Sequence, residues 1–136
     1  MAGNVAEITL RWREALEFEA AAAGRPPVVV DGNSAVATSP VELLLAAAAS
    51  CTASDVVLIL QKQRVVLRGL EVLAQGTRRA EQPRRYTALH FVFTVTGEGA
   101  DEAKARRAID LSLEKYCSVV ASLAPDIRIS YDVALR

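Results

Sequence analysis

The sequence contains few of the residues and motifs from which most catalytic sites are built. Its 136 residues include one histidine and two cysteines, which supply neither the number nor the spacing of ligands that a zinc site needs. No CxxC pair, glycine-rich phosphate loop or serine-elbow motif occurs, so the usual signals of thioredoxin-like, nucleotide-binding and hydrolase sites are absent. We therefore expect neither a metal nor a nucleotide cofactor.

The chain also lacks an excess of charge of either sign. Sixteen basic and sixteen acidic residues cancel, and because the basic residues are dispersed, the electrostatic footprint of a nucleic-acid-binding protein is missing. The N-terminus shows no basic start followed by an apolar run, as a secretory signal would. The longest uncharged run in the most apolar segment, residues 43–54, is too short to cross a bilayer. We expect a soluble, cytoplasmic protein without nucleic-acid or membrane partners.

What is abundant is apolar sequence, at 51% of the residues, enough for one domain over residues 1–136 with its own core. Near the N-terminus apolar residues alternate with polar ones, as in a half-buried strand. This pattern continues to residue 20 and predicts an N-terminal hairpin. A short strand at residues 28–30 follows and ends at the turn Asp31-Gly32-Asn33, whose acidic and amide residues are typical turn formers.

The next segment has the clearest boundary in the chain. Ser39 in the cap position, Pro40 at the first helical position and Glu42 three residues after the cap form a capping box. The helix that begins there is apolar nearly all round until residues 61–64, which predicts a core helix buried on several sides.

The remaining elements alternate between strands and one further helix. Residues 67–77 and 85–96 predict an antiparallel pair of strands, and Asp101 can cap a second helix that reaches about Leu123. Alternation returns from residue 127 to the C-terminus. The order β-β-β-α-β-β-α-β, with antiparallel sheets beside two central helices, indicates the α+β class.

Both cysteines, Cys51 and Cys117, fall inside the predicted helices. Free cysteine often fills a core as a small apolar residue, and a redox pair would place the same two residues side by side. Asp55 lies one turn after Cys51 in a helix otherwise too apolar for an unpaired carboxylate, so it should have a partner, for which Lys115 is one candidate. His90 alternates onto the face opposite its apolar neighbours, which makes it a surface or rim residue rather than a catalytic base.

Three stretches of the sequence resemble a known protein family, and the resemblance extends over nearly the whole chain. SPVELLLAAAASCTASDVVLILQKQR, preceded by DGNS and followed downstream by EKYCSVVASL, resembles the OsmC/Ohr family of osmotically inducible and organic hydroperoxide resistance proteins. The DGNS and EKYCSV segments are most similar to its YhfA-like branch. The resemblance implies an OsmC-like α+β fold, an intertwined homodimer, and reduction of organic hydroperoxides by two cysteines at the subunit interface.

Carried onto this chain, the resemblance makes Cys51 the peroxidatic cysteine and Cys117 the resolving one. In the family an arginine near the N-terminal hairpin, organised by a glutamate, supports the thiolate; Arg13 and Glu42 are the corresponding candidates here. Glu42 lies nine residues before Cys51, whereas the family's glutamate lies ten before, where this chain has Val41. One residue turns a helical side chain by about 100°, and the capping box accounts for Glu42 equally well.

These residues predict a thiol-dependent peroxidase acting in oxidative or osmotic stress defence. Its substrate would be a small organic hydroperoxide, and an external dithiol or lipoyl-type reductant would regenerate the thiols in place of a cofactor. The alternative is a protein of the same fold whose reduced thiols help to bind an apolar ligand or partner with little or no turnover, because one fold serves many functions.

Overall fold

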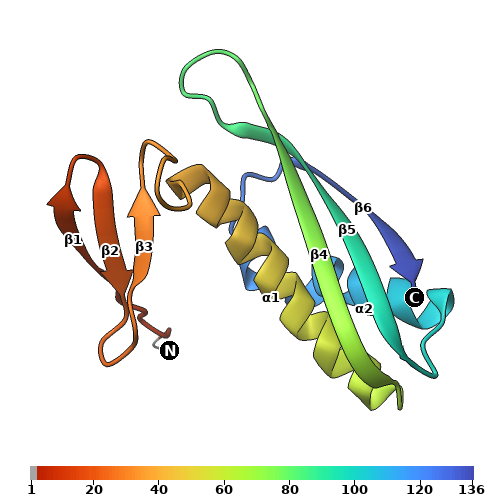
Figure 1. Cartoon of the computed structure of the whole chain (residues 1–136). Helices are drawn as coiled ribbons and strands as arrows, with labels where there is room; N and C mark the ends of the chain where they lie inside the picture. Colours follow the sequence, from red (N-terminus) through yellow and green to blue (C-terminus); the bar gives the residue numbers. More distant parts are fainter. Residues whose placement is uncertain (1–2) are drawn as a thin grey trace. The chain divides into compact units, whose positions relative to one another are not determined.

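The computed structural model describes residues 3–136, and the chain divides after Leu44 into two compact units. The first unit contains an antiparallel sheet, β1 (Thr9–Glu14), β2 (Glu17–Ala21) and β3 (Val28–Asp31), in that order (Figure 1). The predicted hairpin is confirmed. Its turn uses Ala15 at a positive φ of 48°, and Trp12 Nε1 donates a hydrogen bond of 2.9 Å to the Ala15 carbonyl.

The turn after β3 is built on one buried carboxylate. Asp31 accepts hydrogen bonds from the backbone N–H groups of Asn33, Ala35 and Val36 at 2.8, 3.0 and 2.9 Å. These donors, that of Val36 foremost, hold the pKa of Asp31 below its ordinary value because they stabilise the charged form. The predicted role of Asp31 as a turn former is confirmed.

Helix α1 (Pro40–Lys62) begins where the capping box predicted. Ser39 N donates to Glu42 Oε1 at 3.0 Å, and Glu42 N donates in return to Ser39 Oγ at 3.3 Å. This reciprocal pair satisfies two of the backbone donors that a helix start leaves unpaired. By length and composition α1 could cross a membrane, a property it shares with the core helices of soluble proteins.

Only one stripe of α1 is fully buried by its own chain, and the residues beside that stripe are half-buried. The stripe repeats every four residues and consists of Ala48, Thr52, Val56 and Leu60. Leu58, on another face, remains 58% exposed. The prediction that α1 is buried on several sides is therefore wrong for the single chain.

The second unit holds a three-stranded sheet in the order β4 (Val66–Arg78), β5 (Tyr86–Glu98), β6 (Arg128–Leu135). The antiparallel pairing of β4 with β5 is confirmed. β6, however, pairs parallel to β5, so the prediction of purely antiparallel sheets is wrong. The chain returns from the end of β5 through a helical crossover, and a crossover brings the next strand back in the same direction.

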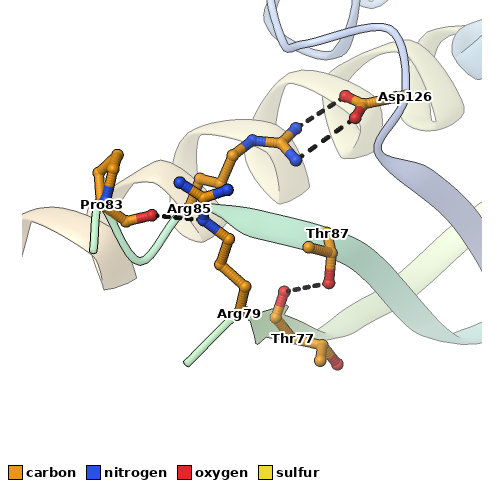
Figure 2. A network of polar contacts seen from close by, with 6 residues as sticks. All are labelled: Thr77, Arg79, Pro83, Arg85, Thr87 and Asp126. Carbon is orange, nitrogen blue, oxygen red and sulfur yellow. Dashed lines mark hydrogen bonds and ion pairs between the residues drawn. The ribbon is translucent and has the colours of Figure 1, made fainter. Parts of the chain in front are cut away.

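Polar contacts at the β4–β5 hairpin tie its loop to the start of β6 (Figure 2). The Arg85 guanidinium forms a 2.7 Å ion pair with Asp126. Within the loop, Arg79 Nε donates to the Pro83 carbonyl at 2.8 Å. These bonds fasten the hairpin loop to the segment that leads from the helical crossover into β6.

The core of this unit lies on one face of the sheet. Alternate residues of β5 point into it, and they meet the buried face of helix α2 (Glu102–Leu111); the buried residues are Leu89, Phe91, Phe93, Val95, Ala105, Ala108 and Ile109. From β6, Tyr131 packs edge-on against Phe93, with 6.1 Å between the ring centroids. The Tyr131 hydroxyl donates to Asp110 of α2 at 2.7 Å, which links helix and sheet.

The second predicted helix is interrupted. Asp101 caps it as expected, accepting from Lys104 N at 2.8 Å. Helix α2 then passes into a π-helical segment, η1 (Ser112–Tyr116), breaks at Cys117, and resumes as α3 (Ser118–Ala121). Cys117 N bonds to the Ser112 carbonyl at 2.8 Å, five residues back, which widens the helix locally. The prediction of one helix continuous to Leu123 is wrong.

Candidate functional site

The two thiols, 66 positions apart by subtraction of 51 from 117, meet within the second unit. Both are free; Cys51 on α1 is half-buried and Cys117 between η1 and α3 is buried, at 3% exposure. Cys117 Sγ accepts a hydrogen bond from Thr52, the residue after Cys51, and the Cys51 thiol contributes to raising the pKa of Cys117, so the two thiols are neighbours. Two sulfurs so placed can be joined by a disulfide without bringing distant elements together.

Thr52, which was not predicted from the sequence as a site residue, contacts the Cys117 sulfur. Its side chain is fully buried, and its hydroxyl donates to Cys117 Sγ at 3.3 Å. The other two hydroxyls nearby on α1 behave differently: Ser50 and Ser54 donate to backbone carbonyls in the preceding turn, as serine usually does inside a helix. The sequence signal that could have identified Thr52 is a polar residue on the buried stripe of an apolar helix.

The break in the second helix gives Cys117 another donor. With ψ of 101° Cys117 is extended and takes the N-cap position of α3, where its sulfur accepts from Val120 N at 3.5 Å. Burial raises the pKa of the Cys117 thiol; the Thr52 hydroxyl and the Val120 N–H act in the opposite direction, and the Cys51 thiol raises it further.

Asp55 has a partner, but not the one suggested from the sequence. Ser112 Oγ donates to Asp55 Oδ2 at 2.8 Å, an ordinary length for an O–H···O hydrogen bond, and Lys115 is exposed. The suggestion of Lys115 fails because the π-helical segment presents Ser112, which is fully buried, to α1. No sequence signal pointed to Ser112.

The contacts of Arg13 and Glu42 all lie within the first unit. Arg13 is exposed on β1, where its Nε is 4.0 Å from Glu19 Oε2. Glu42 accepts from Ser39 N and, at 2.9 Å, from Ser34 Oγ, and these bonds hold its pKa below the ordinary value, with the Ser39 backbone bond contributing most. The capping role of Glu42 is present; a catalytic role of either residue stays a prediction.

His90 lies on the sheet, away from the thiols. It is half-buried on the face of β5 opposite the core, and its ring nitrogens contact Ser130 Oγ at 2.7 Å and Asp132 Oδ2 at 3.2 Å, both on β6. The expected position at the rim is confirmed. No contact links the histidine to either sulfur among residues 3–136.

A cavity of about 560 Å³ is lined by residues near the two cysteines in the sequence, but by neither cysteine itself. Its apolar wall includes Leu58 and Leu111, and its lining also includes Asp55, one turn after Cys51, and Tyr116, the residue before Cys117. Lys62 and Arg107 also line the cavity, so its wall is part apolar and part charged, and a space of this size can hold a small molecule that has both apolar and polar groups.

Comparisons with known proteins identify the family and the fold. The family model for OsmC-like proteins matches residues 31–132. Protein YhfA of Escherichia coli K12 is 43% identical over 127 residues, which cover 91% of this chain and 95% of YhfA. Among solved structures, an OsmC-like protein from Mycoplasma pneumoniae gives a TM-score of 0.83 at 16% identity, covering 98% of this chain and 99% of that one.

A third relative carries a functional name. The organic hydroperoxide resistance protein OhrB of Bacillus subtilis superposes with a TM-score of 0.64 at 14% identity, covering 96% of this chain and 98% of that one. At such identity the likeness extends to the fold alone. The family match and the resemblance to YhfA over nearly the full length establish that this chain belongs to the OsmC-like protein family.

Proposed function

We propose that this chain is a thiol-dependent peroxidase that reduces organic hydroperoxides through Cys51 and Cys117, in defence against oxidative or osmotic stress. The observation that carries the proposal is that two free thiols far apart in the sequence are neighbours, a half-buried one on α1 and a buried one at the break between η1 and α3. Membership in the OsmC-like family supports it, as does the shared fold with a protein named for organic hydroperoxide resistance.

The chemistry has three steps. The Cys51 thiolate attacks a peroxide oxygen, the O–O bond breaks, the alkoxide leaves and is protonated to an alcohol, and Cys51 becomes a sulfenic acid. Cys117 then attacks the Cys51 sulfur, so that an S–S bond forms, the S–O bond breaks, and hydroxide leaves and takes up a proton to give water. An external dithiol, either small or lipoyl-bearing, reduces the disulfide by two successive exchanges.

The proposed substrate class is supported by the cavity that Asp55 and Tyr116 help to line. Because its wall includes apolar residues such as Leu58 and Leu111, it favours a peroxide with an organic substituent over hydrogen peroxide, whose small polar molecule gains nothing from that surface. We therefore expect cumene hydroperoxide to react with a higher kcat/KM than hydrogen peroxide.

The proposal includes a homodimer. Only one stripe of the apolar helix α1 is fully buried by its own chain, and Leu58 is 58% exposed. Trp12 on β1 and Leu73 on β4 are exposed as well, at 68% and 57%. Large apolar surfaces of this kind mark interfaces. Light scattering after gel filtration should give twice the mass of 14.6 kDa, and a monomer at all concentrations would exclude the homodimer.

Arg13 and Glu42 enter the proposal as the cation and the acid that support the Cys51 thiolate. Arg11, on the same strand and exposed like Arg13, supplies a matched control. We expect Arg13→Ala to slow oxidation of Cys51 by roughly tenfold, because a nearby cation favours the thiolate, and Arg11→Ala to leave it unchanged. Equal rates in both variants would remove Arg13 from the mechanism, and Glu42→Gln tests the acid in the same assay.

We further propose that the protein is soluble and cytoplasmic, without membrane or nucleic-acid partners. Its charges cancel, and the polar residues Thr52 and Asp55 of α1 are bonded within the protein. Fractionation of cells should recover the chain in the soluble fraction without detergent or high salt.

The competing function is binding of an apolar ligand or partner with no turnover, which the exposed apolar faces of α1 favour. Treatment with cumene hydroperoxide separates the two. A peroxidase should lose about 2 Da in the intact mass under non-reducing conditions, and Cys117→Ser should stop at a sulfenic acid, about 16 Da heavier, or beyond. Unchanged mass with Cys51 still alkylatable would favour the binding protein.

A dithiothreitol-coupled assay adds the kinetic test. Wild type should consume peroxide with turnover, and Cys51→Ser should be inactive because the attacking sulfur is gone. Equal rates in the two proteins would refute the catalytic role of Cys51.

A further inference from the structure

We propose that the Thr52 hydroxyl is a catalytic hydrogen-bond donor that stabilises the Cys117 thiolate as it forms, and thereby controls the disulfide-forming step rather than the reaction with peroxide. This inference rests on the proposed function for the step it assigns, while the contact that carries it stands on geometry. Thr52 Oγ1 lies 3.3 Å from Cys117 Sγ in the buried interior.

The direction of the bond matters. A threonine hydroxyl that points at sulfur can donate its hydrogen, and the Cys117 sulfur accepts a second donor from Val120 N at 3.5 Å. Two donors aimed at one sulfur stabilise its anion more than its neutral form, because hydrogen bonds to a charged acceptor are stronger. The two donors therefore offset part of the cost that burial imposes on the ionised, nucleophilic form of Cys117, whose pKa stays above its ordinary value.

The backbone supports this arrangement. Inside a regular helix Cys117 would bond its own N–H four residues back, and Val120 N would not reach its sulfur. The π-helical turn and the extended conformation at Cys117 free the N–H groups at the start of α3. π-helical segments inside helices recur at functional sites.

Among the groups near Cys117, the two hydrogen-bond donors and Cys51 determine how readily its thiol ionises. From α1 the titratable group that acts on the Cys117 thiol is Cys51, and Asp55 is bonded to Ser112. On its own segment, Lys115 and Tyr116 are exposed. The sheet face that packs on the helices is apolar, with Leu89 and Phe91 among its buried residues.

The same contacts give the cycle an order. A thiolate at Cys51 opposes loss of the Cys117 proton, because it accepts a hydrogen bond from the Cys117 thiol and because its charge disfavours a second anion beside it. Conversion of Cys51 to the neutral sulfenic acid removes that charge, whereas the donors Thr52 and Val120 remain. Cys117 thus loses its proton more readily when it must attack.

The decisive variants are Thr52→Val, which keeps the shape and loses the hydroxyl, and Thr52→Ser, which keeps the donor. Ser54→Ala removes a hydroxyl that donates to the helix backbone instead and serves as the matched control. Each protein is reduced, mixed with one equivalent of cumene hydroperoxide and quenched over time. Peroxide loss reports Cys51 oxidation, and the non-reduced mass reports the disulfide.

We expect Thr52→Val to oxidise Cys51 at the wild-type rate but to form the disulfide roughly 3- to 10-fold more slowly at pH 7, because the gain in nucleophilicity offsets only part of the lost thiolate. The deficit should shrink at alkaline pH, where Cys117 ionises without help. Thr52→Ser and Ser54→Ala should stay within about twofold of wild type at every pH. A slowing that is equal at all pH values, or absent, would overturn the assignment.

A second readout does not depend on peroxidase activity. In Cys51→Ser proteins carrying 13Cβ-labelled cysteine, the titration midpoint of Cys117 should be higher in the Thr52→Val protein than in the Thr52→Ser protein. Equal midpoints would refute the role of Thr52. If wild type forms no disulfide with peroxide while the midpoints differ, the proposed function falls and the Thr52–Cys117 link stands. Should Thr52→Val not fold, Thr52→Ala gives the same comparison.

Discussion

Replacement of Gly76 on β4 by alanine should destabilise the sheet that packs against the cysteine-bearing helix. Gly76 pairs with Leu89 of β5, and the buried ring of Tyr86 covers its α-carbon. A Cβ added there would overlap Tyr86 Cε1 and lie 2.7 Å from Tyr86 Cδ1 and 2.9 Å from Leu45 Cδ2. The ring is rigid and buried, so it cannot move aside without disturbing its neighbours.

The cost can be set against a gain. Overpacking of this kind costs about 1–3 kcal/mol, while exchange of glycine for alanine stabilises by about 0.4–1 kcal/mol through the unfolded chain. The midpoints of these ranges, about 2 and about 0.7 kcal/mol, leave a net loss of about 1.3 kcal/mol, or a fall in Tm of roughly 3–5 °C for a chain of this size. Gly69 on the same strand is the matched control, because the nearest atom to its added Cβ is Thr96 Cβ at 3.7 Å.

Thermal unfolding followed by circular dichroism at fixed protein concentration provides the measurement. Gly76→Ala should melt below wild type, and Gly69→Ala at or slightly above it. Tyr86→Leu in the Gly76→Ala background should recover part of the added cost, because it removes one of the two clashing groups. Similar melting temperatures for Gly76→Ala and Gly69→Ala would show that the ring does not hold its place over Gly76.

Three further outcomes follow from polar contacts. Ser112→Ala should lower the free energy of unfolding by about 1–3 kcal/mol, because Asp55 loses its hydrogen-bond donor. Asp55→Asn keeps an acceptor for Ser112 and should lower it less. Urea titrations that give the reverse order would contradict this. Glu42 has a lowered pKa, so the stability it contributes is complete above its ordinary pKa of 4.5 and is lost as pH falls through the pKa of the folded protein. Glu42→Gln should therefore reduce the fall of Tm at acidic pH. An unchanged fall would count against the capping role of Glu42. Tyr131 has a pKa raised by burial and by Asp110, so the stability it contributes is complete below its ordinary pKa of 10.0 and declines as pH rises through the pKa of the folded protein. Tyr131→Phe should lower the free energy of unfolding by about 1 kcal/mol at pH 7. It should also abolish the loss of stability at alkaline pH that Tyr131 causes.

Elements set by local chemistry were predictable from the sequence. The start of α1 followed from Ser39, Pro40 and Glu42, because the capping box is formed by neighbours in the chain. The β4–β5 pair followed from alternation, since only one face of the sheet is buried. The Asp31 turn followed in the same way from a side chain that bonds its own backbone.

Features set by distant contacts were not predictable. The segment around Cys117 contains neither glycine nor proline, so no local signal predicts the helix break. At the break, Cys117 accepts a hydrogen bond from Thr52, 65 residues away. The parallel direction of β6 depends on where the crossover lands. The uncovered faces of α1 could not be foreseen because an apolar helix has the same sequence whether its own chain or a second one covers it.

The polar residues of α1 nevertheless marked the site. A helix this apolar can hold Thr52 on its buried stripe and Asp55 one turn beyond Cys51 only if each finds a partner, since an unsatisfied polar group in such surroundings loses its hydration without compensation. Both partners come from a single stretch: Ser112 at its start and Cys117 at its end. The two bonds fasten the π-helical turn to α1 at two points, so that Cys117 is held beside Cys51 by side chains that flank it. Loss of either bond should therefore affect disulfide formation more than the reaction of Cys51 with peroxide.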